Sequence, residues 1–203
     1  MDGASAYLVV ALGCLVGLAV VVAVLRRRRR NRGRAPVGRQ RRHGGGPRRD
    51  PRRIEVGDVV EVGDGAYPVR GSIRLVEGEW SWAQHLFDDP DRLGGRHRLS
   101  VAESPGFELV LWEPAPRAAT VTPGVPVVEF DGRRYSWHES GQARYTASGA
   151  TGLAPSGTMR YHDYRAPGGA RLTFEAYGET GWEMARGERL ADGEVNVHPQ
   201  DGA

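Results

Sequence analysis

The chain has 203 residues and a formal net charge of +3, and it contains no lysine, so all 28 basic residues are arginine. The absence of lysine excludes a phosphate-binding GxxxxGK[ST] loop and Schiff-base chemistry. The single cysteine, Cys14, excludes an internal disulfide and leaves no thiolate chemistry for the rest of the chain.

The small net charge hides two regions of opposite sign. Fourteen of the arginines lie between Arg26 and Arg53, whereas residues 54–203 carry fourteen Arg against twenty-three Asp and Glu, a formal charge of −9. This asymmetry indicates a basic segment followed by an acidic domain. The lack of cysteine in that domain agrees with a reducing, cytoplasmic location.

Residues 6–25 form a run of twenty uncharged residues dominated by Leu, Val and Ala. Twenty helical residues span about 30 Å, the thickness of a bilayer's hydrocarbon core, so the run predicts a transmembrane helix. Five arginines follow at once, and arginine marks the cytoplasmic side. We therefore expect a single-pass cell-membrane protein with its N-terminus outside and its C-terminal domain in the cytoplasm. A cleaved secretory signal is the alternative, but its basic residues would precede the apolar run.

Two candidate contact sites belong to this N-terminal region. The five arginines next to the bilayer are expected to attract anionic lipids, at about 1 kcal/mol each. They are Arg26, Arg27, Arg28, Arg29 and Arg30. Gly13 and Gly17 form a small-xxx-small pattern that lets two such helices approach closely, so they are the candidate face of a helix dimer. The protein partner of the chain, of which another membrane protein is one candidate, is a separate expectation.

Residues 26–53 are rich in Arg, Gly and Pro and have almost nothing to bury, which predicts a disordered linker. Segments of this composition also bind RNA. No aromatic residue is interleaved here to stack on a base, so nucleic acid is the less favoured partner.

From Ile54 the pattern changes to short runs in which apolar and polar residues alternate. The clearest runs are 69–75, 107–111 and 171–176. A period of two predicts strands with one buried face and one solvated face.

Turn signals, in which Gly follows Asp, Glu, Ser or Pro, separate these runs. They occur at Asp64-Gly65, Glu77-Gly78, Ser104-Pro105-Gly106, Asp131-Gly132, Ser140-Gly141, Pro167-Gly168-Gly169 and Asp192-Gly193. We therefore predict an all-β domain over residues 54–199, folded as an antiparallel sandwich or an open barrel. The proline-marked segment 113–126 is a candidate division into two β subdomains.

Several short motifs lie between Val56 and Glu175. They are Val56-Gly57-Asp58, Tyr67-Pro68-Val69-Arg70-Gly71, Trp82, Leu86-Phe87-Asp88-Asp89, Leu99-Ser100-Val101-Ala102-Glu103, Leu111-Trp112, Tyr161-His162-Asp163-Tyr164 and Glu175. Together they resemble the bacterial domain-of-unknown-function family 4178, which often has a Trp-Leu pair where this chain has Arg98-Leu99. The resemblance implies a β-rich domain, often on membrane-attached proteins, and it supplies no catalytic residue.

The residues themselves favour a structural interpretation of these motifs. Gly57-Asp58 is typical of a turn that enters a strand at Val59. Trp80 and Trp82 are two residues apart, so they share one face of a strand, where packing is favoured over stacking on a ligand.

Histidine and acidic residues supply the remaining candidates for chemistry. If the sheet brought His138 and His162 together with Glu139 or Asp163, they would form a metal or acid–base site. Their spacing in the sequence is not that of metal ligands. The chain also has neither a G-x-S-x-G nor a G-x-G-x-x-G motif. We predict no catalytic residue, no cofactor and no metal site.

The leading hypothesis is therefore a membrane-anchored cytoplasmic β-domain that works as a protein-binding scaffold or accessory subunit. The alternative is an enzyme or small-ligand-binding domain with its site on the concave face of the sheet. A pocket lined by convergent polar groups would favour the alternative.

Overall fold

The structure is a computed structural model that describes residues 49–88, 96–104, 106–115, 121–191 and 193–200. The chain divides into two compact units, residues 1–43 and 44–203, and every described residue belongs to the second. The described elements are η1 (Pro51–Arg53), β1 (Val59–Val62), β2 (Gly65–Pro68), β3 (Gly71–Glu77), β4 (Trp80–Asp88), β5 (Arg96–Ser104), β6 (Glu108–Pro114), β7 (Val127–Phe130), β8 (Arg133–Gly149), β9 (Ser156–Arg165), η3 (Pro167–Gly169), β10 (Ala170–Tyr177), β11 (Glu183–Leu190) and β12 (Val195–His198).

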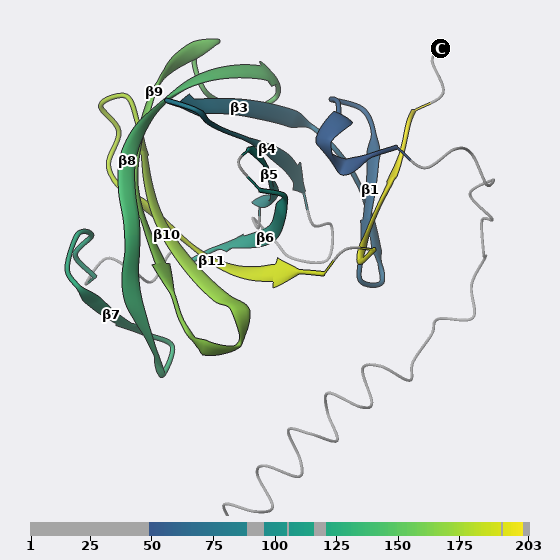
Figure 1. The fold of residues 1–203 in the computed structure, drawn as a ribbon. Coiled ribbons are helices and arrows are strands. Elements are labelled where there is room, and N and C mark those ends of the chain that lie inside the picture. Colours follow the sequence, from purple (N-terminus) through teal and green to yellow (C-terminus); the bar gives the residue numbers. More distant parts are fainter. Residues whose placement is uncertain (1–48, 89–95, 105, 116–120, 192, 201–203) are drawn as a thin grey trace, which may run out of the picture. The chain divides into compact units, whose positions relative to one another are not determined.

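A closed antiparallel barrel is the main feature of the fold (Figure 1). Nine strands follow the order β3-β4-β5-β6-β11-β10-β9-β8-β7, and β3 also pairs with β8. In that closing pair Gly71 lies opposite Gly149 and Val76 opposite Arg144. The predicted all-β character is confirmed. The predicted sandwich or open barrel is wrong, because β3 pairs with β8 and so closes the eight strands β3–β6 and β8–β11 into a barrel, with β7 as an additional strand beside β8.

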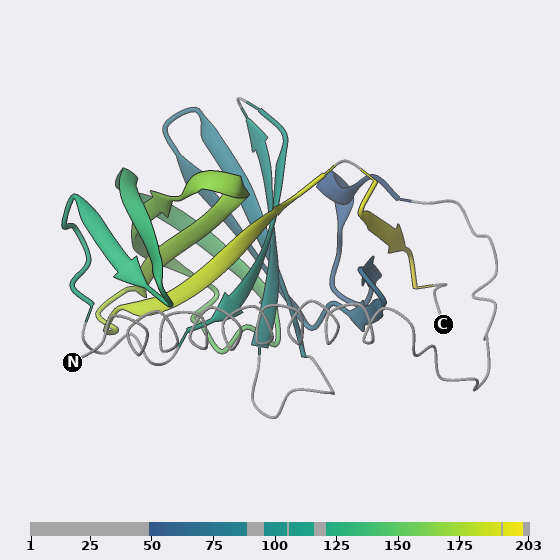
Figure 2. The same ribbon diagram turned by 90° about the horizontal axis from the view of Figure 1, so that it is seen from below.

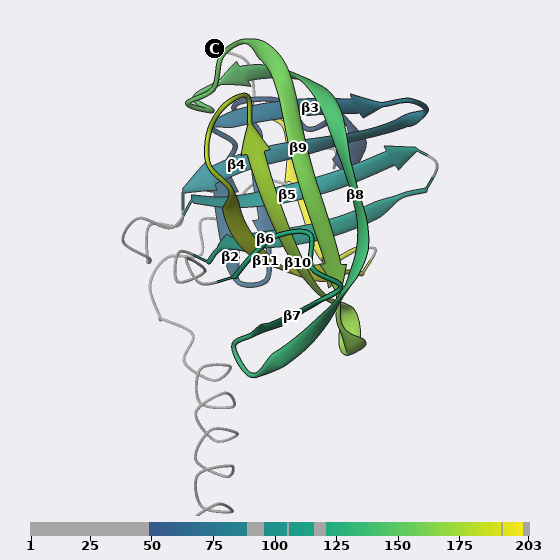
Figure 3. The same ribbon diagram turned by 90° about the vertical axis from the view of Figure 1, so that its left-hand side faces the viewer.

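Two four-stranded meanders, β3–β6 and β8–β11, build the barrel wall. Figure 3 shows β8, β9 and β10 crossing in front of the strands of the first meander. The chain reaches β8 through residues 115–126 and the short strand β7, which pairs with β8. The strands on both sides of segment 113–126 thus belong to one sheet.

Strand β8 is 17 residues long and extends beyond the barrel to pair with β7. Asp131 and Gly132 join the two strands with φ values of 51° and 70°, the positive angles that a type I′ hairpin turn requires. The turn predicted at Ser140-Gly141 is wrong, because both residues lie inside β8. Gly141 leaves room there for the carboxylate of Glu77, which would have to shift if residue 141 had a Cβ atom.

A smaller sheet, in the order β12-β1-β2, packs on the outer face of the barrel wall (Figure 2). It pairs the beginning of the domain with its end, since Val60 of β1 lies opposite Val197 of β12. Both valines are fully buried. The apolar layer between sheet and barrel consists of Ile54, Val60, Val69, Phe87, Leu99, Val101, Leu109, Val195 and Val197.

The turn predicted at Gly57-Asp58 is confirmed, and its residues have clear reasons. Gly57 has φ +98°, a conformation that favours glycine. The buried carboxylate of Asp58 accepts hydrogen bonds from the backbone N–H of Glu55 and from Nη1 of Arg49, both at 2.9 Å. Arg49, placed in the linker by sequence, therefore belongs to the folded domain.

The predicted membrane-spanning helix and single-pass membrane location require correction. The helical elements η1 and η3 have three residues each, and no helix in the described part of the chain is long and apolar enough to cross a bilayer. Residues 6–25 lie outside the described residues, as do Gly13, Gly17 and Arg26 to Arg30. The fold assignment therefore contains no membrane-spanning helix.

His85 gives the domain a pH dependence that unfolding measurements can test. Its ring is buried, Nδ1 lies 2.9 Å from Oγ of Ser72, and burial followed by the charge of Arg74 lowers the His85 pKa to about 4. A lowered histidine pKa means that the unfolded chain binds the proton more tightly. Stability should therefore fall by about 3 kcal/mol as pH drops from 6.5 towards 4, measured by urea unfolding. His85→Gln should flatten this slope, and an unchanged slope would contradict the assignment.

Candidate functional site

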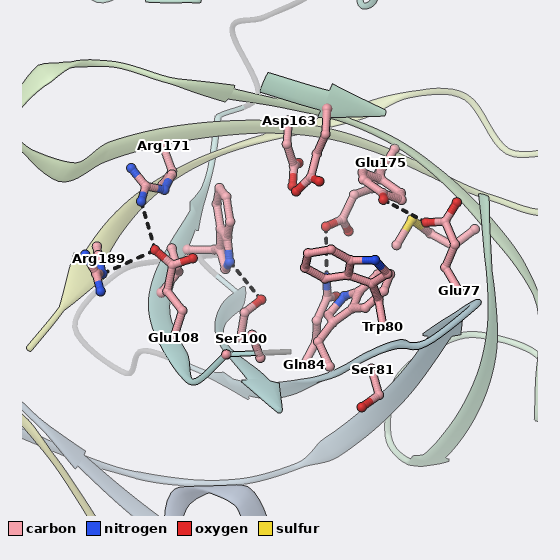
Figure 4. Close-up of a pocket in the computed structure, with 18 of the residues that line it drawn as sticks. Glu77, Trp80, Ser81, Gln84, Ser100, Glu108, Asp163, Arg171, Glu175 and Arg189 are labelled. Carbon is pink, nitrogen blue, oxygen red and sulfur yellow. Dashed lines mark hydrogen bonds and ion pairs between the residues drawn. The ribbon is translucent and has the colours of Figure 1, made fainter. Parts of the chain in front are cut away.

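A cavity of about 910 Å³ lies inside the barrel (Figure 4). Successive side chains of a strand point to opposite faces, so alternate residues of each wall strand line it. On β4 these include Trp80, Trp82 and Gln84, which confirms that the two tryptophans share a face, and Ser81 also lines the cavity where the register with β5 shifts. On β9 they include Tyr161 and Asp163.

The polar face of β10, predicted to be solvated, points into the barrel instead. Arg171 and Glu175 line the cavity, and Thr173 between them is buried. The opposite, apolar face of the strand carries Leu172 and Phe174, which pack outside the barrel in a cluster that also includes Val128 and Tyr135 from the β7–β8 hairpin. The alternation was therefore read correctly, but the assignment of the polar side to solvent was wrong.

A polar network centred on Glu175 forms one part of the barrel interior, and within it Nε of Arg98 is buried without a hydrogen-bond partner. Nη1 of Arg98 lies 2.6 Å from Oε2 of Glu175, and Nε2 of Gln84 donates to Oε1 of Glu175 at 2.8 Å. The Tyr177 hydroxyl donates to Oε1 of Gln84 at 2.9 Å and approaches Oε2 of Glu175 at 3.2 Å. Burial raises the Tyr177 pKa well above 10, so this hydroxyl remains a donor at neutral pH. The buried Glu175 thus has the partners that a buried charge requires.

On another part of the wall, Glu108 bridges two arginines (Figure 4). Its Oε1 accepts from Nη2 of Arg171 at 2.8 Å and lies 3.3 Å from Nε of Arg189. Nearby, Nε1 of Trp112 donates to Oγ of Ser100 at 2.9 Å. These contacts fix the side chains around this part of the cavity.

Asp163 faces the cavity beside a second carboxylate, because Glu139 is its partner across the β8–β9 pair. Burial raises the Asp163 pKa to about 7. The charges of Glu175 and Glu139 raise it further, while a hydrogen bond with Thr173 and the charge of Arg98 oppose the shift. Asp163 therefore changes its charge near neutral pH.

Aromatic side chains and a carboxylate occupy the β3–β4 side of the cavity. Trp82 packs edge-on against Tyr161 with ring centroids 5.8 Å apart, and the Tyr161 hydroxyl donates to Oε2 of Glu77 at 2.7 Å. Trp80 lies at the end of the hairpin and remains 55% exposed. The cavity thus has an aromatic wall next to its acidic groups.

Comparison with known proteins shows which family the chain belongs to. The family model described as Domain of unknown function (DUF4178) matches residues 55–192. The chain belongs to the DUF4178 family. Relatives 35% identical over 201 residues include Uncharacterized protein Mb2628 of Mycobacterium bovis and Uncharacterized protein Rv2597 of Mycobacterium tuberculosis, with 95% of both chains covered in each case. No solved structure matches the chain.

The DUF4178 domain brings together only part of the site considered from sequence. Glu139 and Asp163 do meet, but the ring of His162 packs against Trp182, 5.1 Å away, and Nε2 of His138 lies 3.9 Å from Glu139 at the surface. No group of three or more His, Cys, Asp or Glu side chains in the described ranges is arranged to hold a metal ion.

Sequence reasoning missed the residues that form the interior network, namely Arg98, Gln84 and Tyr177. The signal that did exist was the set of family motifs. Trp82, Tyr161, Asp163 and Glu175 all belong to those motifs, and all four line the cavity of the DUF4178 domain. Their interpretation as purely structural residues missed this convergence.

Proposed function

We propose that the DUF4178 domain binds a small organic molecule inside its barrel. The observation that carries this proposal is the convergence of four family-motif residues, Trp82, Tyr161, Asp163 and Glu175, on one cavity. Its volume of about 910 Å³ lies within the range of small-molecule sites.

The character of the lining also supports ligand binding. Aromatic rings offer apolar contact, while a few fixed polar groups provide orientation, as in other small-molecule sites. The carboxylate of Glu175 is already held by Arg98, Gln84 and Tyr177, so this part of the site is formed before any ligand arrives. Preorganisation of this kind lowers the entropic cost of binding.

Titration with a neutral fluorescent probe tests the proposal. N-phenyl-1-naphthylamine, added to the full chain, should show a saturable rise in emission with one site per chain. Ala102→Trp should weaken that binding by about tenfold or more, because residue 102 lines the cavity and an indole would fill part of it.

Val76→Trp is the matched control, since Val76 is exposed on β3 outside the cavity lining. It adds the same side chain without entering the cavity and should leave the probe affinity unchanged. A chain that binds no probe, or an Ala102→Trp variant that binds as well as the natural chain, would overturn the proposal.

Protein binding, the leading hypothesis from sequence, is the second candidate. Trp137 and Trp182 are 47% and 37% exposed and do not line the cavity, and exposed tryptophans are common anchors of protein interfaces. Because they lie outside the cavity, Ala102→Trp would leave such an interaction intact. That difference separates the two functions experimentally.

A further inference from the structure

The charges around the cavity are unequal in number. Six carboxylates and three guanidinium groups line it. The carboxylates belong to Glu77, Glu79, Glu108, Glu139, Asp163 and Glu175, and the guanidinium groups belong to Arg165, Arg171 and Arg189.

Ion pairing neutralises only two of these carboxylates. Glu108 is held by Arg171 and Arg189, and Glu175 is held by Arg98. Arg165 is the one lining arginine of the described residues that is paired with none of these carboxylates, while two arginines share Glu108. The six carboxylates against Arg98, Arg165, Arg171 and Arg189 leave a formal charge of −2.

Four carboxylates therefore keep a net negative potential over one side of the cavity. Glu77 accepts hydrogen bonds from the neutral Tyr161 hydroxyl and from the backbone N–H of Gln142 at 3.0 Å, which leaves its charge in place. Glu139 lies near His138, but burial and the charge of Arg165 lower the His138 pKa, so this imidazole is neutral at pH 7. Glu79 and Asp163 complete the group.

The aromatic wall lies on the same side of the cavity as these carboxylates. Trp80 follows Glu79 directly, and Trp82 is connected through the Tyr161 ring to the carboxylate of Glu77. Figure 4 shows Trp80 and Glu77 on this side, with Asp163 pointing into the cavity. The electron-rich face of a tryptophan attracts cations, and an adjacent carboxylate reinforces the attraction.

We propose that the ligand of this cavity is an organic cation, in which an ammonium group is joined to an apolar body. The ammonium group lies between the tryptophans and the carboxylates of Glu139 and Asp163, and the apolar body extends towards Trp112 and Val110. An anionic ligand is disfavoured because the carboxylates outnumber the guanidinium groups around the cavity. This inference rests on the proposed function and names its ligand class.

A pair of ligands that differ only in charge tests the inference on the full chain. Phenyltrimethylammonium and tert-butylbenzene have nearly the same shape, and each is used to displace N-phenyl-1-naphthylamine at pH 8. We expect the cation to bind about tenfold more tightly than its neutral counterpart. Benzoate, which carries a negative charge, serves as the anionic ligand in this comparison and should not displace N-phenyl-1-naphthylamine.

Variants then locate the charge selectivity. Asp163→Asn combined with Glu139→Gln should reduce about tenfold the ratio of the affinity for phenyltrimethylammonium to the affinity for tert-butylbenzene. Glu179→Gln combined with Glu188→Gln also removes two carboxylates, at exposed positions outside the cavity lining, and should leave this ratio unchanged. Thermal melting of each variant confirms that it is folded.

The outcomes distinguish this inference from the proposed function. Probe binding without a preference for the cation would overturn the ligand class and leave small-molecule binding standing. A preference that survives in the double variant would overturn the roles of Asp163 and Glu139. Absence of probe binding would overturn both the inference and the proposed function.

Discussion

Asp163→Asn should stabilise the domain at pH 8 and have almost no effect on its stability at pH 4. The pKa of Asp163 is about 7 in the folded chain against 3.8 for an ordinary aspartate, so the folded state holds this proton more tightly than the unfolded state. Its stabilising contribution is complete below pH 3.8 and is lost as pH rises through 7. Since each pKa unit corresponds to 1.36 kcal/mol, the gain at pH 8 is up to about 4 kcal/mol.

Urea unfolding of both chains at the two pH values measures this effect. The groups that set the Asp163 pKa are Glu175 and Thr173 on β10, Glu139 on β8 and Arg98 on β5. None of them changes in the variant, so the comparison isolates the single carboxyl group. An equal stability difference at both pH values would contradict the assignment. A natural residue that costs stability at neutral pH is typical of a site retained for function.

Arg98→Met should destabilise the domain by about 3–5 kcal/mol at pH 7. Its partner Glu175 is buried, and removing one member of a buried ion pair leaves the other charge without compensation. The free energy of unfolding in urea measures the loss.

Two further chains control this result. Arg98→Met combined with Glu175→Gln removes both charges and should recover much of the lost stability. Arg171→Met removes an arginine whose partner Glu108 keeps Arg189, and it should cost about 1 kcal/mol or less in ion-pair energy. If Arg98→Met lowered the free energy of unfolding by no more than Arg171→Met does, the Arg98–Glu175 pair would not stabilise the domain as a buried ion pair.

The sequence was most informative about local structure. Alternation over residues 69–75 and 171–176 located β3 and β10, and Asp131-Gly132 marked a true hairpin. Closure was not predictable, because it depends on β3 pairing with β8 from a distant part of the chain. The prediction of a turn at Ser140-Gly141 was wrong for a related reason. Gly141 leaves room for Glu77 on the neighbouring strand β3, a contact that depends on the β3–β8 pairing.

The site could be predicted only in part, because strand alternation does not distinguish outer solvent from a polar interior. Arg171 and Glu175 have the pattern of a solvated face, yet they line the cavity. Arg98 carried no signal at all, since its role depends on a partner 77 residues away. The family motifs were the better guide, because they include Trp82 and Asp163, which are far apart in the sequence and line the same cavity.

The polar network inside the barrel also has a consequence for the order of folding. Gln84 and Glu175 are separated by 91 positions in the chain, and they belong to different meanders. Each meander consists of local pairings that form early, whereas contacts of such high sequence separation form slowly. In a partly folded chain whose two meanders have not yet associated, Glu175 would lack its partners Gln84 and Arg98. We therefore expect the cavity to form only when the two meanders associate, so that a partly folded chain with one meander would lack it.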